Sequence, residues 1–130
     1  MKRRTVTYWI ATALVAFVMG ISGVLALSHT PSYMTALSHL GYPAYFSNLL
    51  GLGKIAGVCV LLAPGLGRLK EWAYAVFGIV VLSACYSHLS SGDGLMALEP
   101  LATGALLVLS YAMRPADRRF AVRAQVAANA

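Results

Sequence analysis

Charged residues are scarce in this sequence, and acidic residues are the scarcest of them. Only 11% of its 130 residues are charged, against about 25% in ordinary soluble domains. Hydrophobic residues make up 59%. A soluble domain of this composition would lack the polar surface to cover itself, so we expect an integral membrane protein. A chain of this length normally forms one domain.

Four apolar segments follow one another along the chain. They cover residues 8–27, 45–63, 72–89 and 95–113, and each is close to the roughly 20 residues that a helix needs to cross a bilayer. The sequence therefore predicts an all-α bundle of four transmembrane helices, formed by residues 1–113. The basic tail that follows, 114–130, either lies on anionic lipid as an amphipathic helix or remains solvated.

A short helix is expected between the first two spans. Thr30 and Pro31 are typical of a helix start, and Gly41 is typical of a helix end. Pro43 then begins the second span. The short helix should be amphipathic and lie on the membrane face, with three side chains directed inward: Tyr33, Leu37 and Leu40.

Basic residues decide the predicted orientation. Nine of the ten lie before span 1, between spans 2 and 3, or after span 4: Lys2, Arg3, Arg4, Arg68, Lys70, Arg114, Arg118, Arg119 and Arg123. Because basic loops stay in the cytoplasm, we expect a bacterial inner-membrane protein with both termini in the cytoplasm. The net charge of +6 then reflects orientation, and no nucleic-acid partner is predicted. A cleaved signal peptide over residues 1–28 is the alternative, although its apolar run exceeds the usual length of about 7–15 residues.

Cysteine is rare, and its placement argues against dithiol chemistry. Cys59 and Cys85 lack a CxxC spacing and fall inside apolar runs, where free thiols are expected. Their predicted heights differ by about 13 Å at helical rise, whereas a disulfide needs Cα atoms within about 7 Å. The sequence also lacks a ligand set for flavin, haem or an iron–sulfur cluster, so no intrinsic cofactor is predicted.

Lys54 is the tenth basic residue and lies inside span 2. A lysine at the centre of a bilayer costs about 2.5–3.5 kcal/mol and usually faces the bundle interior or a cavity. Helical side chains lean toward the N-terminus, which places the Lys54 ammonium nearer the outer face. Gly53 and Gly57 are expected to form a small-residue face for helix packing. The alternative is a snorkelling lysine with no function.

Glu99 is the natural partner for Lys54. It lies in the first turns of span 4, so its side chain also leans outward, and an ion pair would neutralise both charges. Alternatively, Glu99 is simply an exposed residue that is favoured by the helix dipole.

His88 and Asp93 end span 3 and begin the next turn. Ala84 and Cys85 leave room for the His88 ring to enter the bundle, although an interfacial histidine is the alternative. Asp93 serves either as a turn residue or as part of the same site. The three histidines and two carboxylates on this face lack metal-ligand spacing, so no metal site is predicted. The ligand-binding hypothesis rests on four residues: Lys54, His88, Asp93 and Glu99.

A second polar group marks the predicted cytoplasmic interface at the start of span 3. It consists of Arg68, Lys70, Glu71 and Trp72. Orientation charges and interfacial aromatics account for these residues, and docking of a cytoplasmic partner is the alternative.

Residues 37–93 carry a series of short motifs in a fixed order: HLGYPAYF, LGLGKIAG, LLAPG, RLKEWAYA, and SH followed by GD. This run resembles the DoxX-like family, part of the wider DoxX group of small bacterial membrane proteins. The resemblance implies a four-helix membrane bundle. Some DoxX relatives are subunits of a thiosulfate:quinone oxidoreductase, and others are linked to oxidative-stress complexes.

The family motifs place recurrent polar residues at four positions: Lys54, Glu71, His88 and Asp93. Many relatives carry an acidic residue before the glycine of the second span, where this chain has Leu49 and Leu50. Glu99 is not part of the motif, so His88 and Asp93 are alternative partners for Lys54.

Two functions are compatible with these features. The first is a redox-associated membrane subunit with a polar outer pocket for a quinone, acting beside a partner oxidoreductase. The second is a non-enzymatic membrane protein for assembly or stress response. A proton-coupled transporter is less favoured, because the first span has no ionisable residue. Glycines in spans 1 and 2 would also allow a homodimer.

Overall fold

The computed structural model describes residues 2–120 and 129, and most of that part of the chain is helical. Its elements are α1 (Lys2–Leu27), α2 (Pro31–His39), α3 (Phe46–Leu62), α4 (Gly67–Ser90), η1 (Gly94–Ala97), α5 (Leu98–Ala112) and η2 (Ala116–Arg118), where η marks a 3-10 helix. No β-strand occurs among the described residues. The all-α prediction is confirmed.

Three segments are long and apolar enough to cross a membrane: Lys2–Leu27, Gly67–Ser90 and Gly94–Ala112. The other apolar helix, α3, has 17 residues. Helices α1 and α4 begin several residues before the predicted boundaries at 8 and 72. The difference arises because lysine, arginine, glutamate and leucine are strong helix formers, whereas an apolar window measures hydropathy alone.

The short helix expected between the first two spans is present as α2. Pro31 occupies its first turn and Thr30 its N-cap position. Gly41, just after the helix, has a φ of +88°, which glycine adopts without strain. Leu37 is buried, as its predicted inward position requires. The following helix begins at Phe46 rather than at Pro43.

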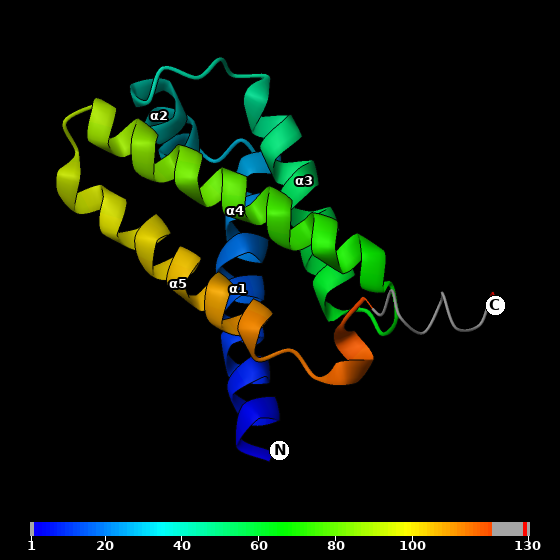
Figure 1. Cartoon of the computed structure of the whole chain (residues 1–130). Coiled ribbons are helices and arrows are strands. Elements are labelled where there is room, and N and C mark those ends of the chain that lie inside the picture. The colour runs from blue at the N-terminus through cyan, green and yellow to red at the C-terminus, as the bar shows by residue number, and fades with distance from the viewer. Residues whose placement is uncertain (1, 121–128, 130) are drawn as a thin grey trace.

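The four larger helices form a ring in which each contacts two neighbours (Figure 1). Helix α1 packs against α3 and α5, and α4 packs against the same two helices. The hydrophobic core includes Met19, Leu61, Tyr74, Phe77 and Leu107. Because Leu61 lies in the last turn of α3 and Tyr74 lies near the start of α4, this core is displaced toward the end of the bundle that holds both of those termini.

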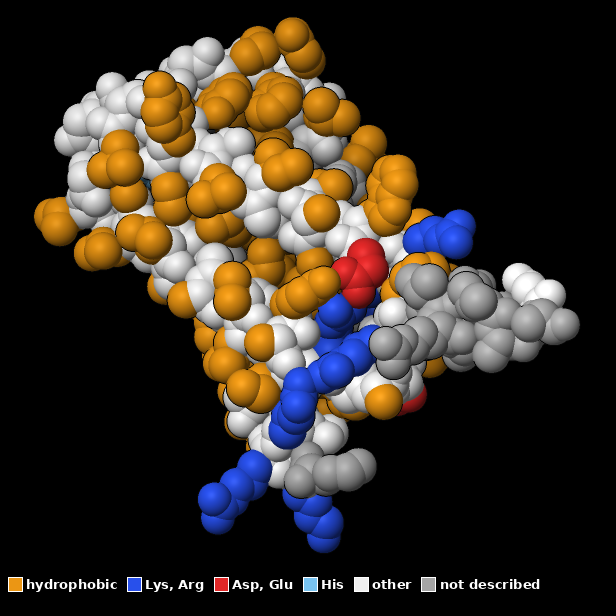
Figure 2. Space-filling model, viewed as in Figure 1, with side chains coloured by type: hydrophobic (Ala, Val, Ile, Leu, Met, Phe, Trp, Pro, Cys, Tyr) orange, Lys and Arg blue, Asp and Glu red, His pale blue; other side chains and the backbone are white. Residues whose placement is uncertain are grey.

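The two ends of the bundle differ in charge. The first, here named the basic end, holds Lys2, Arg3, Arg4, Arg68, Lys70, Arg114, Arg118 and Arg119. Figure 2 shows the lysine and arginine side chains gathered there, while apolar side chains are spread over the rest of the visible face. The opposite end, here named the histidine end, holds His29, His39 and His88. Of the tail predicted over 114–130, residues 121–128 and 130 lie outside the described residues.

Two glycines of α3 permit close helix packing, but Gly53 is not one of them. A Cβ at Gly57 would lie 2.5 Å from the Cζ atom of Phe77, and a Cβ at Gly51 would lie 2.6 Å from Cγ of Leu27. A Cβ at Gly53 would have no neighbour within 4 Å. The prediction is therefore wrong for Gly53. It lies on the same side of α3 as Gly57, but one turn nearer the histidine end, where no neighbouring atom approaches its Cβ position.

Candidate functional site

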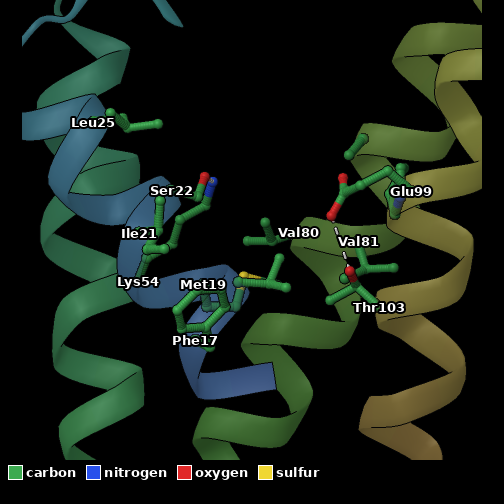
Figure 3. A pocket seen from close by; sticks show the side chains of 13 residues that line it. Phe17, Met19, Ile21, Ser22, Leu25, Lys54, Val80, Val81, Glu99 and Thr103 are labelled. Atoms are coloured by element: carbon green, nitrogen blue, oxygen red, sulfur yellow. Dashed lines mark hydrogen bonds between the residues drawn. The ribbon is translucent and has the colours of Figure 1, made fainter. Parts of the chain in front are cut away.

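Two adjoining cavities occupy the half of the bundle nearer the histidine end. The larger, of about 500 Å³, lies among α1, α2, α3, α4 and α5. The smaller, of about 420 Å³, lies among α1, α3, α4 and α5 and is shown in Figure 3. Their shared lining consists of Ser22, Lys54, Val80, Ala84 and Glu99. Two of the predicted site residues thus separate one cavity from the other.

Lys54 is half-buried on α3 and is held by hydroxyl groups. Its ammonium donates a hydrogen bond of 2.6 Å to Ser22 Oγ on α1 and a longer one of 3.4 Å to the Tyr33 hydroxyl on α2. The same nitrogen lies 5.6 Å from the centre of the Tyr33 ring. Because α2 belongs to the histidine end, the side chain reaches the side that the sequence predicts.

Tyr33 belongs to α2 and contributes a phenol to the larger cavity. Burial raises the pKa of Tyr33 above its ordinary value of 10.0, and a hydrogen bond with Ser22 lowers it in part. The phenol is therefore neutral at physiological pH and remains a hydrogen-bond donor.

Glu99 lies across the cavity from Lys54 (Figure 3). Its Oε1 atom accepts a hydrogen bond of 3.0 Å from Thr103 Oγ1, one turn later on α5. No ion pair joins Lys54 to Glu99 in the described part of the chain. The expected pair is not formed, because the Lys54 ammonium is directed toward Ser22 and Tyr33 on its own side of the cavity.

His88 lines the larger cavity from the last turns of α4. Its Nδ1 atom is buried without a hydrogen-bond partner and lies 3.7 Å from Asp93 Oδ2. The ring therefore enters the bundle, as the small residues Ala84 and Cys85 predict. Asp93 does not line the larger cavity, but its carboxylate lies beside the His88 ring.

The Asp93 carboxylate contacts α2 rather than Lys54. Its Oδ2 atom lies 2.6 Å from His39 Nε2 at the end of α2. A second tie joins the Tyr42 hydroxyl to Ser87 Oγ at 2.7 Å. The sequence does not identify either contact, because it contains no signal that brings residues about fifty positions apart together.

The predicted group at the start of span 3 divides into buried and exposed members. Lys70 is fully buried and donates to the carbonyl groups of Val60 and Ala63 at the end of α3. Arg68 and Trp72 are exposed. Lys70 thus caps a helix terminus, which leaves Arg68 and Trp72 as the surface members of the group.

Glu71 joins α4 to the end of α5. Its Oε1 atom lies 2.6 Å from Arg114 Nη1, and its Oε2 atom accepts a hydrogen bond of 2.8 Å from the Tyr111 hydroxyl. The Arg114 guanidinium lies over the Tyr111 ring at 3.9 Å. The sequence shows an aromatic and basic end to span 4 but not this network.

Both cysteines are free. Within residues 2–120 and 129, no cluster of three or more His, Cys, Asp or Glu side chains is arranged to hold a metal ion. The candidate site therefore offers an ammonium, a phenol, an imidazole and a carboxylate, surrounded by apolar walls. Such a lining suits a lipophilic molecule with a small polar head.

No curated protein and no solved structure matches this chain. A family model does match, over residues 10–112, and its description is the DoxX-like family. The match covers most of the chain and every residue that lines the two cavities. The sequence resemblance is confirmed, and this chain of apolar helices belongs to the DoxX-like family of membrane proteins.

Proposed function

We propose that this chain spans the bacterial inner membrane four times, with both termini in the cytoplasm, and binds a quinone-like ligand in the cavities around Lys54. At about 1.5 Å per residue, the 17 residues of α3 extend over about 25 Å. A hydrocarbon core is about 30 Å thick, and spans of about 17 residues occur. Basic side chains gathered at one end support the orientation.

The orientation has a direct test. Single cysteines would be placed at Ser38 on α2 and at Ala116 on η2, in a chain that also carries Cys59→Ser and Cys85→Ser. A membrane-impermeant maleimide added to intact spheroplasts should label the cysteine at 38 and spare the one at 116. Labelling only at 116 would show that the orientation is the opposite of the proposed one. Equal labelling rates at positions 38 and 116 would contradict four spans.

One observation carries the ligand proposal: Lys54 and Glu99 face the same cavities from different helices without pairing. An ammonium has three donors, and Lys54 directs one to Ser22 and a longer one to Tyr33. The remaining donor is available to a carbonyl oxygen of a quinone. A quinol hydroxyl would donate to Glu99 instead, so the cavity offers a partner to each redox form.

His88 adds proton exchange to this proposal. Its Nδ1 atom is buried without a hydrogen-bond partner, and the two nitrogens of a histidine ring can donate and accept protons. The chain would bind and protonate the ligand, and the electrons would come from a partner oxidoreductase. We assign the electron supply to a partner because the sequence provides no ligand set for haem, flavin or iron–sulfur clusters.

The test is native mass spectrometry and lipid extraction of the protein in nanodiscs. Wild type would be compared with Lys54→Met, with His88→Ala and with Lys2→Met, a matched loss of a lysine from the basic end. We expect wild type and Lys2→Met to retain a quinone, and the two cavity variants to lose it.

A structural role is the second candidate, and hydrogen bonds between helices favour it. Lys54 joins α3 to α1, and Asp93 joins the turn after α4 to α2. In that case the polar residues stabilise the bundle of a non-enzymatic assembly or stress-response protein. Equal retention of lipid alone by all four proteins would favour this role and overturn the quinone proposal.

A further inference from the structure

The smaller cavity has an unusual wall, because part of it is the outer face of α1. Phe17 and Ile21 line this cavity, yet 65% and 46% of their surfaces are exposed. Leu25 lines it one turn further along and is also exposed. A cavity whose lining residues are exposed at the side of a bundle opens sideways.

The opening lies between α1 and α5. These helices are joined toward the basic end, where Thr12 Oγ1 and Ser110 Oγ lie 2.6 Å apart and both residues are buried. Nearer the histidine end, the cavity lies between them and is lined on the α5 side by Glu99, Pro100 and Thr103. In a bilayer this side of the bundle faces acyl chains, so the cavity connects the polar residues to lipid.

The route from the aqueous side is obstructed by α2. Tyr33 and Leu37 of this helix, and Leu40 directly after it, line the larger cavity. The contact of His39 with Asp93 and that of Tyr42 with Ser87 hold α2 and the turn after it against the end of α4 and the turn that follows α4.

We infer that the ligand is a membrane-dissolved molecule with a single flexible tail, which enters sideways between α1 and α5. Its polar head lies in the larger cavity beside Lys54, Tyr33 and His88. Its tail passes through the smaller cavity and leaves the bundle along Phe17 and Ile21. This inference rests on the proposed function, and it excludes water-soluble solutes as the natural ligand class.

The experiment compares a tail-less benzoquinone with its decyl derivative on the full chain in nanodiscs. Ile21→Trp narrows the opening without changing a polar group. Ile10→Trp is the matched control, because Ile10 is exposed on the same helix and lines neither cavity. We expect Ile21→Trp to weaken binding of the decyl compound by about tenfold or more and to leave the tail-less compound unaffected. Ile10→Trp should change neither.

Photo-crosslinking locates the tail directly. A decyl benzoquinone with a diazirine at the end of its tail should label the segment of α1 that contains Phe17 and Ile21, and unlabelled quinone should compete. Crosslinks confined to α2 or to Phe46 at the start of α3 would overturn the sideways route while leaving the site intact. Failure of the tail-less compound to bind saturably to wild type would overturn the proposed function and this inference together.

Discussion

The Lys54 ammonium on α3 donates a 2.6 Å hydrogen bond to the Ser22 hydroxyl on α1. The lysine is thereby anchored to one wall of the cavities, and Glu99 faces them from α5 (Figure 3). The charge remains within reach of a ligand and also contributes to helix association. Both consequences can be measured.

The first prediction concerns the contribution of this hydrogen bond to the free energy of unfolding. Ser22→Ala should lower the free energy of unfolding in detergent micelles by about 1–2 kcal/mol, because a bond to a charged donor is lost. In a Lys54→Met background the same substitution should cost less than half as much. A double-mutant cycle isolates this difference. Equal costs in the two backgrounds would show that the hydrogen bond contributes nothing to stability.

The second prediction concerns two glycines on α3. Gly57→Ala should destabilise the protein by about 1–3 kcal/mol through overpacking, because the new Cβ would lie 2.5 Å from the ring of Phe77, which is buried. Gly53→Ala is the matched control, since its Cβ meets no neighbour within 4 Å; it should be neutral or stabilise by up to about 1 kcal/mol. Chemical unfolding of both variants checks this. Similar losses would refute the assignment of Gly57 to the packed face.

The third prediction concerns the network at the basic end. Arg114 is almost fully buried and lies 2.6 Å from Glu71. Arg114→Leu should therefore cost about 2–4 kcal/mol, since Glu71 would lose its partner. Arg114→Lys should recover less than half of that loss, because lysine lacks the guanidinium plane that stacks on Tyr111. The matched control is Lys2→Leu at the exposed start of α1, and a loss there equal to that of Arg114→Leu would contradict a specific role for the network.

The fourth prediction concerns alkaline pH. Burial raises the pKa of Tyr33 above its ordinary value of 10.0, so the folded state holds the phenolic proton more tightly than the unfolded state does. Stability is fully present below the unfolded pKa and is lost as pH rises through the folded pKa.

Tyr33→Phe removes this titration. Thermal unfolding should show a constant offset between the variant and wild type up to about pH 9, with a shallower decline for the variant above about pH 10. Parallel curves across the whole alkaline range would contradict a buried phenol at position 33.

The helices of this chain were predictable because hydropathy and turn residues are local signals. The short helix α2 follows from Thr30, Pro31 and Gly41 alone. The first residues of α1 and α4 were harder to predict from the sequence, since polar residues continue a helix beyond its apolar part. The number of spans remains a prediction, because α3 is shorter than the other apolar segments.

The sequence singles out some of the polar residues around the larger cavity, but not their contacts. A lysine in an apolar segment signals a cavity by itself, and the structure places Lys54, His88 and Glu99 around one. Ser22 and Tyr33 carry no such signal, because a serine or tyrosine in an apolar helix is common. The partner of Asp93 is His39, and this pairing depends on how the ends of distant helices meet.

If these cavities bind a ligand, a tritiated decyl benzoquinone should bind saturably to the protein in nanodiscs. Ala84 lines both cavities, so Ala84→Leu should fill the site, whereas Ala56→Leu on the exposed face of α3 should not. We expect one saturable site per chain in wild type and in Ala56→Leu, with affinity at least about tenfold weaker in Ala84→Leu at unchanged thermal stability. Non-saturable uptake, or equal affinity in all three proteins, would contradict ligand binding in these cavities.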